Sequence, residues 1–170
     1  MADRISRLLV VDSSVVHAAG ASEHPVSSAT RQFLSWVLDI CHRVVVTAEI
    51  REEWRRHQSK ISRRWLLAMY ARKKVVELRV PIDAEFRARM SGRDCSPQQR
   101  AAVLKDVHLI EAALQSDRIV VSLAERARVL FQVHELNTII WVNPVLANSQ
   151  IQSWLEQGAP PVDEWRLDQA

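Results

Sequence analysis

Leu8-Leu9-Val10-Val11-Asp12-Ser13-Ser14 is the stretch of the sequence that decides the fold. Its four consecutive branched apolar residues are typical of a strand buried on both faces, as the central strands of parallel sheets are. A carboxylate that follows such a strand lies at the carboxyl end of the sheet, where open α/β folds bind ligands. Because an unpaired buried anion is costly, Asp12 needs a cation or hydrogen-bond donors. The stretch therefore predicts an α/β protein with a site at Asp12. The alternative is a structural Asp that caps the next turn with Ser13 and Ser14.

Helices and strands alternate along the rest of the chain. Further strands are expected at 44–47, 119–122 and 138–142, with a shorter one within 74–80. Helices are expected at 27–41 (capped by Ser27 and Ser28), 48–58, between 58 and 74, and at 82–90, 97–115, 125–134 and 149–157. This alternation predicts an α/β/α sandwich with a central parallel sheet of about four to five strands. The domain spans 1–150, and 151–170 form the end of the last helix and an acidic, Pro-containing tail.

Composition narrows the class of protein. With 170 residues, 48% of them hydrophobic and 25% charged, the chain suits one globular domain with a proper core. No apolar run reaches the roughly 18 residues of a membrane span. Cys41 and Cys95 are too few for a disulfide framework, and the six His lack a metal-binding spacing. These features predict a cytoplasmic protein with reduced thiols and no membrane partner.

Two familiar α/β functions are disfavoured by what the sequence lacks. Three glycines in the whole chain cannot form the Gly-rich phosphate turn of a dinucleotide-binding module. A receiver-type signalling domain also ends its first strand with Asp. It needs a second acid close to that Asp and a Lys at the end of a later strand, and the sequence offers neither.

Positive charge is concentrated between residues 51 and 80. This segment has ten Lys and Arg against three Asp and Glu, an excess of seven, whereas the remaining chain has four more acids than bases. Within it, Ile61, Trp65 and Met69 share one helical face and leave the cations towards solvent. Such an excess favours binding of a phosphate backbone over a merely solvated helix face. The cations expected to bind RNA are Arg55, Arg56, Lys60, Arg63 and Arg64.

Two further acids lie at the edges of apolar helix faces. Glu53 borders the face of Ile50 and Trp54, and Asp106 borders the face that includes Val107. An acid in this position is either paired with a neighbouring cation or binds something positive. Candidate ion-pair partners are Lys105 or Arg100 for Asp106, and Arg56 or His57 for Glu53. Together with Asp12, these acids can meet at one end of the sheet, where oxygen ligands suit Mg²⁺ or Mn²⁺.

The chain resembles the PIN-domain nucleases, particularly their bacterial toxin-like branch. The resemblance covers roughly residues 8–145 and rests on four pieces in the right order. They are Leu8-Leu9-Val10-Val11-Asp12-Ser13-Ser14, Val46-Thr47-Ala48-Glu49-Ile50-Arg51-Glu52-Glu53-Trp54, Lys105-Asp106-Val107-His108-Leu109-Ile110-Glu111-Ala112-Ala113-Leu114 and Asp117-Arg118-Ile119-Val120-Val121-Ser122-Leu123.

The resemblance implies a metal-dependent endoribonuclease that cleaves single-stranded RNA, with DNA a weaker alternative. Asp12, Glu53 and Asp106 become the catalytic residues, and Asp12 and Asp106 the ligands of Mg²⁺ or Mn²⁺. Glu49 and Glu52 compete for the second position, but Glu53 is preferred because the family places its acid just before an apolar or aromatic residue. The implied role is the toxin of a toxin–antitoxin or defence system. Its implied partners are an antitoxin protein and a second copy of the chain.

The family pattern breaks after the strand at 119–122. Where the family has Ser or Thr, any residue, and then Asp, this chain has Ser122-Leu123-Ala124, and Glu125 comes one position late. Ala124 is interpreted either as natural degeneration or as a substitution that silences a toxic nuclease. It also leaves an alternative function open, a non-catalytic PIN-like module for RNA binding or assembly.

Overall fold

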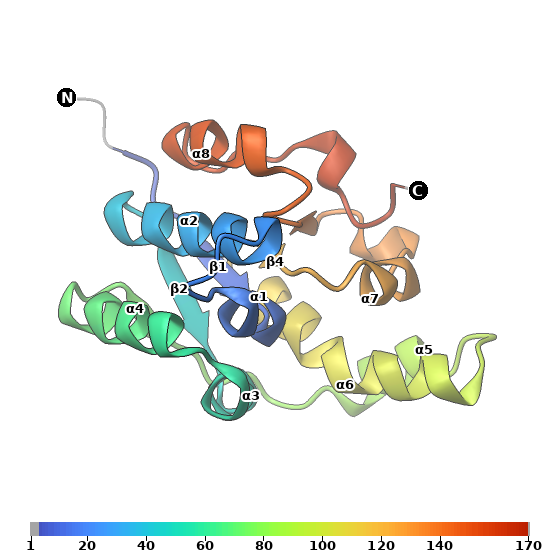
Figure 1. Ribbon diagram of the computed structural model, residues 1–170. Coiled ribbons are helices and arrows are strands. Elements are labelled where there is room, and N and C mark those ends of the chain that lie inside the picture. Colours follow the sequence, from blue (N-terminus) through green and yellow to red (C-terminus); the bar gives the residue numbers. More distant parts are fainter. Residues whose placement is uncertain (1–3, 170) are drawn as a thin grey trace.

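A parallel sheet of five strands lies at the centre of the computed structural model, which describes residues 4–169 (Figure 1). Residues 1–3 of the predicted domain and residue 170 of the predicted tail lie outside this part. The strands are β1 (Leu8–Val11), β2 (Arg43–Val46), β3 (Val75–Glu77), β4 (Ile119–Val121) and β5 (Ile140–Val142), in the spatial order β3-β2-β1-β4-β5. The predicted α/β/α sandwich with a parallel sheet of four to five strands is confirmed.

Eight α-helices surround the sheet in the described part of the chain. They are α1 (Ser13–Ala18), α2 (Pro25–Asp39), α3 (Ala48–His57), α4 (Lys60–Ala71), α5 (Ala84–Ser91), α6 (Pro97–Leu114), α7 (Glu125–Leu130) and α8 (Asn148–Glu156). Helix α2 contacts α4 and α8, while α6 packs on β1 and β4 and contacts α5 and α7. Within the described residues, no helix is both long enough and apolar enough to cross a membrane.

The strand order reverses beside β1. The chain passes from β1 outwards to β2 and β3, and then returns across the sheet to β4 and β5. Because parallel connections are right-handed, helices that connect strands in opposite directions lie on opposite faces of the sheet. The carboxyl ends of β1 and β4 therefore flank a crevice of the kind in which open α/β sheets bind ligands. Asp12 directly follows β1, and Ser122 directly follows β4.

The strands form the buried core that holds this edge in place. Val10, Val11, Val45 and Val120 have no exposed surface, as expected for strands covered by helices on both faces. The register pairs Val11 with Val121 across β1 and β4. The residues after these two strands are consequently fixed side by side at the same level of the sheet.

Three helix assignments made from the sequence need correction. The helix expected at 125–134 is α7, which ends at Leu130, where the Phe131 N–H donates to the carbonyl of Arg128. Helix α2 begins at Pro25 rather than at Ser27 and Ser28, because the His24 side chain accepts a hydrogen bond from the Val26 N–H, and Pro25 suits the first turn. The sequence also gave no sign of α1, which is only six residues long. Helices this short carry too few residues for a recognisable apolar period.

The C-terminal residues return to the edge of the sheet. After α8, a short 3₁₀ helix (Asp163–Trp165) places Trp165 edge-on against Trp154, with 5.2 Å between the ring centroids. Arg166 forms an antiparallel bridge with Ile140, and the Leu167 N–H donates a 2.9 Å hydrogen bond to the carbonyl of Ile139. Leu167 is fully buried. The tail therefore covers the outer edge of β5.

Candidate active site

Asp12 is held by hydroxyl groups at the carboxyl end of β1. Its side chain is 5% exposed, and Oδ2 accepts hydrogen bonds from Ser14 Oγ at 2.6 Å and from Ser122 Oγ at 2.7 Å. Both hydroxyl oxygens themselves accept a backbone N–H, from Leu123 and Ala124 respectively, so their own protons are free to point at Asp12. Asp12 directly precedes α1, and its side chain accepts hydrogen bonds from the hydroxyls of Ser13, at 3.4 Å, and Ser14, but from no backbone N–H of that helix. Asp12 is thus the residue at the N-terminus of α1 and bonds Ser13 and Ser14, as the structural alternative expects, but its carboxylate does not cap the backbone of the helix.

A small cavity of about 210 Å³ opens beside Asp12. Asp106, from α6, lines the same cavity. The other lining residues are Ser13, Ser14, His17, His57, Lys105 and Ala124. The structure thus brings together two of the three predicted acids from elements that are far apart in the sequence.

The pKa of Asp106 is raised to about 6 from its usual value of 3.8. The main cause is burial of the carboxylate, and the negative charges of Asp12 and Glu53 add to it, while Lys105 acts in the opposite direction. Lys105 therefore does not neutralise the site. Arg100, the other predicted partner, instead donates a hydrogen bond to the carbonyl of Ser91. An uncompensated pair of acids in one cavity favours either a bound proton or a bound cation.

Glu53 lies on α3 next to the buried imidazole of His108. His108 Nε2 is 3.3 Å from Glu53 Oε1, but the two atoms are not aligned as a hydrogen bond, and neither ring nitrogen has a hydrogen-bond partner. This contact lowers the pKa of Glu53, although burial opposes the shift. The predicted partners Arg56 and His57 do not pair with Glu53. Sequence reasoning missed His108 because its position depends on how α3 packs against α6.

The two competing acids of α3 point elsewhere. Glu49 forms a 2.9 Å ion pair with Arg87, and Glu52 forms ion pairs with Arg55 at 3.0 Å and Arg56 at 3.1 Å. Glu52 therefore lies on the solvent face of α3, where it neutralises cations. Glu53 does not line the cavity, but its charge is close enough to raise the pKa of Asp106.

Arg87 ties three helices together beside this site. Its guanidinium, on α5, contacts both carboxylate oxygens of Glu111 on α6, at 2.9 and 2.6 Å, in addition to Glu49 on α3. The Glu111 side chain is only 6% exposed, so this is a nearly buried ion pair. These contacts fix the relative positions of α3 and α6, and hence of Glu53 and Asp106.

Position 124 lies on the wall of the cavity. Ala124 lines it together with Asp12 and Asp106, so a carboxylate at this position would face the two acids. The neighbouring Glu125 does not take its place, because Glu125 Oε1 accepts a 3.0 Å hydrogen bond from Asn143 Nδ2. Among residues 4–169, no three His, Cys, Asp or Glu side chains are arranged to hold one metal ion. The donor set available is two carboxylates and hydroxyl oxygens. That set fits Mg²⁺, which keeps several waters and is usually bound by one or two carboxylates.

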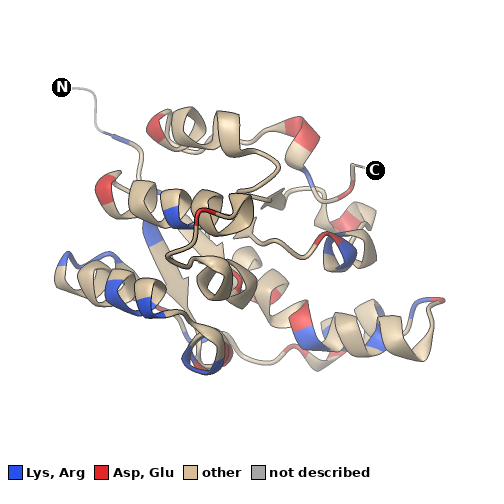
Figure 2. Cartoon of the chain, viewed as in Figure 1, with Lys and Arg blue, Asp and Glu red and all other residues tan. Residues whose placement is uncertain are grey.

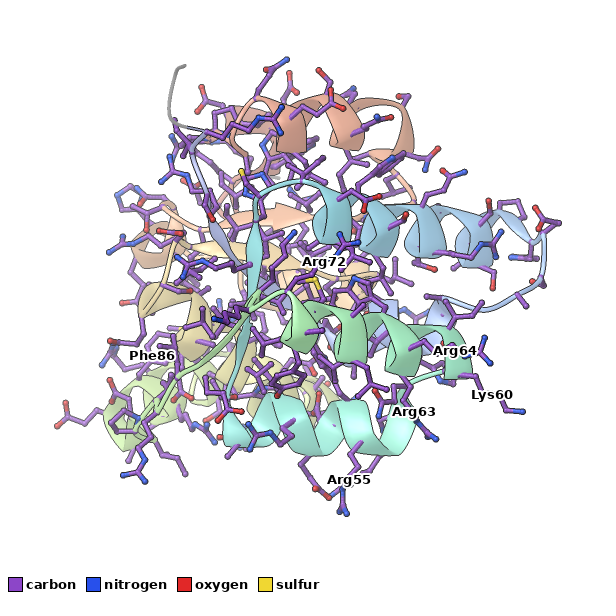
Figure 3. The ribbon with its side chains drawn as sticks, turned by 90° about the vertical axis from the view of Figure 1, so that its left-hand side faces the viewer. Arg55, Lys60, Arg63, Arg64, Arg72 and Phe86 are labelled. Atoms are coloured by element: carbon purple, nitrogen blue, oxygen red, sulfur yellow. The ribbon has the colours of Figure 1, made fainter. Side chains whose placement is uncertain are left out.

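Exposed cations gather on α3 and α4 (Figure 2). Of the five predicted to bind RNA, Arg55 and Arg56 are in the ion pairs with Glu52. Lys60, Arg63 and Arg64 form no ion pair with any described residue, and they project from one end of α4 into solvent (Figure 3). We call these three residues the basic surface. Arg72, at the opposite end of α4, pairs with Asp39.

The basic surface is attached to the helix that borders the cavity. The Ser62 hydroxyl donates a 2.7 Å hydrogen bond to the Val16 carbonyl, which also accepts the Ser59 N–H at 3.2 Å. These bonds join the first turn of α4 to α1. Through His57 and the two residues after it, α3 leads from the rim of the cavity to Lys60.

Three cavity residues were not predicted to belong to the site, namely His17, His57 and Lys105. Helical spacing was a usable signal for His57, which lies four residues after Glu53 on the predicted helix α3 and so shares a helix face with it. No such signal existed for His17, because it lies on α1, which was not predicted. Lys105 precedes Asp106, and it had been considered only as an ion-pair partner.

Comparison of the chain with protein-family models, with curated proteins and with solved structures gave no match. The roles of the residues therefore have to be argued from their geometry and chemistry.

Proposed function

We propose that the protein is a PIN-type, metal-dependent endoribonuclease that acts on single-stranded RNA. The observation that carries this proposal is the placement of Asp12 and Asp106 in one cavity at the point where the strand order reverses. Burial and the neighbouring acids raise the pKa of Asp106 to about 6, so its ionised form is poorly compensated by protein groups. A divalent cation would compensate both charges, and oxygen ligands suit Mg²⁺ or Mn²⁺.

Each residue of the proposed metal site has a separate role. Asp12 and Asp106 would hold the cation, and Ser14 and Ser122 orient Asp12 through their hydrogen bonds. Contact with His108 lowers the pKa of Glu53 and so keeps it ionised, and Glu53 would accept the proton that hydrolysis releases. When bound, the cation would polarise the phosphodiester and promote its hydrolysis.

The basic surface supplies the affinity for RNA in this proposal. Lys60, Arg63 and Arg64 are exposed and free of ion pairs within the described residues, so they can neutralise backbone phosphates. Arg55 and Arg56 can also bind backbone phosphates if they give up their ion pairs with Glu52. The resemblance to toxin-like nucleases extends the proposal to a cytoplasmic toxin–antitoxin or defence role, with an antitoxin protein and a second copy of the chain as partners.

Ala124 supports a second candidate, a non-catalytic module for RNA binding or assembly. The residue leaves an uncharged gap in the wall of the acidic cavity. A site with one carboxylate fewer binds a divalent cation less strongly, because each ligand charge contributes to affinity. The basic surface is independent of this position, so RNA binding would survive the loss of cleavage.

Replacing Ala124 by Asp distinguishes the two candidates. We expect Ala124→Asp to cleave single-stranded RNA in the presence of Mn²⁺ at least tenfold faster than the parent chain. The matched control is Ala124→Asn, which has nearly the same shape but no charge and should remain as slow as the parent. A second control, Asp12→Asn combined with Ala124→Asp, should abolish the gain. If Ala124→Asp binds RNA but cleaves neither RNA nor DNA, the binding module replaces the nuclease.

A further inference from the structure

Three residues that line the cavity carry nitrogen groups rather than carboxylates. They are His17 from α1, His57 from α3 and Lys105 from α6, and all three are exposed. None of these three residues has a role in the site proposed above. Their shared position raises the question of which part of a substrate they contact.

The protonation pattern of His17 is set by its neighbour. His17 Nδ1 lies 2.8 Å from the backbone carbonyl oxygen of His57, and a carbonyl oxygen can only accept a hydrogen bond. Nδ1 therefore carries a proton. In the neutral imidazole this leaves the lone pair on Nε2, so that Nε2 is a hydrogen-bond acceptor. No residue in the described range 4–169 donates a hydrogen bond to it.

Two contacts with His57 hold the exposed imidazole ring of His17. Besides the hydrogen bond to His57, the two imidazoles meet edge to face with 6.2 Å between their centroids. The preceding residue, Val16, accepts the two hydrogen bonds that anchor the first turn of α4. An acceptor held in this way can discriminate between ligands because it does not have to be ordered on binding.

Lys105 adds a cation to the lining of the cavity. Its side chain forms no ion pair within 4 Å with a described residue, yet its charge is close enough to lower the pKa of Asp106 against the larger effects that raise it. An exposed ammonium group at a cavity that is connected to the basic surface through His57 is suited to one phosphate of a polynucleotide.

We propose that His17 and Lys105 form a ribose–phosphate subsite that makes the protein prefer RNA to DNA. Lys105 binds a backbone phosphate, and His17 Nε2 accepts a hydrogen bond from the ribose 2′-hydroxyl, a donor that DNA lacks. The RNA single strand would then run from the basic surface across His57 to the carboxylates of Asp12 and Asp106. This inference rests on the proposed function, because it takes a single-stranded polynucleotide as the substrate.

Binding measurements with sugar-modified probes test the subsite without relying on cleavage. The probes are a short single-stranded RNA, the DNA of the same sequence and the 2′-fluoro RNA, which keeps an RNA-like sugar but cannot donate the hydrogen bond. Fluorescence anisotropy is measured in Ca²⁺, and the RNA is checked for integrity afterwards. One hydrogen bond predicts that RNA binds about three- to tenfold more tightly than either other probe.

Variants assign the effect to the two residues. In His17→Asn the amide nitrogen can replace Nδ1 as donor to the His57 carbonyl, while Nε2 is lost. The ratio of RNA affinity to DNA affinity should therefore fall to about one, and the affinity for DNA should not change. Lys105→Gln should weaken the binding of RNA and of DNA equally, and it should reduce the slope of log Kd against log salt by about 0.7. Arg43→Gln removes a cation at the start of β2, the opposite end of the sheet, and should change neither quantity.

The outcomes separate this inference from the proposed function. If the parent chain binds no single strand, both fail together. If it binds RNA but shows no preference over DNA, or if His17→Asn keeps the preference, the subsite is wrong and the proposed function stands. Should His17→Asn fail to fold by circular dichroism, 2′-fluoro RNA decides alone, because binding as tight as that of RNA overturns the subsite.

Discussion

Ser122 donates a 2.7 Å hydrogen bond to Asp12 and thereby joins the ends of β1 and β4. Ser122 is fully buried and Asp12 nearly so. A buried carboxylate is tolerated only when its oxygens find donors, and here hydroxyl groups supply them in place of a cationic side chain. Oδ2 of Asp12 accepts from both Ser14 and Ser122. No arginine or lysine among residues 4–169 forms an ion pair with Asp12, so its carboxylate is available to a bound cation.

Asp12→Asn should weaken binding of Mn²⁺ at least tenfold in isothermal titration calorimetry, because the central carboxylate of the proposed site is lost. The matched comparison is Ser122→Ala, which removes a hydrogen bond to Asp12 but keeps the charge, and should retain binding within a few-fold. Equal Mn²⁺ affinity of the parent chain and Asp12→Asn would remove Asp12 from the site.

Asp106→Asn should make the protein more stable at neutral pH. The pKa of Asp106 in the folded chain is about 6, above the usual 3.8, so the folded state holds the proton more tightly than the unfolded state. Stability therefore falls as pH rises from about 4 to 6, and the full penalty applies above that range. After allowance for the partial exposure of Asp106, the free energy of unfolding of Asp106→Asn should exceed that of the parent chain by on the order of 1–2 kcal/mol at pH 7, and the two should be equal at pH 4.

Urea unfolding at the two pH values measures this gain. Saturating Mn²⁺ should stabilise the parent chain and not Asp106→Asn, since the cation needs the carboxylate. A difference between the two proteins that is the same at pH 4 and pH 7 would contradict the electrostatic explanation and point to altered packing.

Reversing the charges of Arg63 and Arg64 should weaken RNA binding and its dependence on salt. Loss of two phosphate contacts lowers the slope of log Kd against log salt by about 1.4 for a single strand. Arg63→Glu with Arg64→Glu is compared with Arg72→Glu, which lies at the other end of the same helix and pairs with Asp39. An unchanged slope in the double variant would show that the basic surface is only a solvated helix face.

Arg87→Met should destabilise the fold by about 3–5 kcal/mol, because it leaves Glu111 buried without its partner. Adding Glu111→Leu should recover most of the loss, since an apolar pair of similar volume replaces the ion pair. Chemical denaturation of the single and double variants gives both values. If the double variant is no more stable than Arg87→Met, the cost lies in packing of α5 rather than in the unpaired charge.

Much of the fold could be predicted from local sequence patterns. The run Leu8–Val11 and the other valine- and isoleucine-rich stretches became the strands, since apolar residues on both strand faces fit only a covered sheet. The acid after β1 and the acid on the edge of α6 meet in one cavity, as expected for residues at the carboxyl end of parallel strands. These features depend on short-range periodicity and on topology, which the sequence carries directly.

The ion pairs could not be predicted in the same way. The residue beside Glu53 is His108, and the partner of Glu49 is Arg87; in both cases the two residues belong to different helices. Sequence spacing offers partners three or four positions away, and it assigned Arg56 to Glu53 although Arg56 pairs with Glu52. It does not show which helices touch. The hydrogen bond of His17 to the His57 carbonyl has the same origin, because α1 and α3 meet only in the folded chain.

The return of the C-terminal tail to β5 has a consequence for how the protein behaves at high concentration. An open sheet ends in strands whose outer N–H and C=O groups can pair with another molecule, and such edges seed aggregation unless something covers them. Arg166 and Leu167 occupy this position on β5. Cutting the chain after Gly158 would uncover the strand together with the apolar surface beneath Leu167, and the shortened protein would recruit strands from its neighbours.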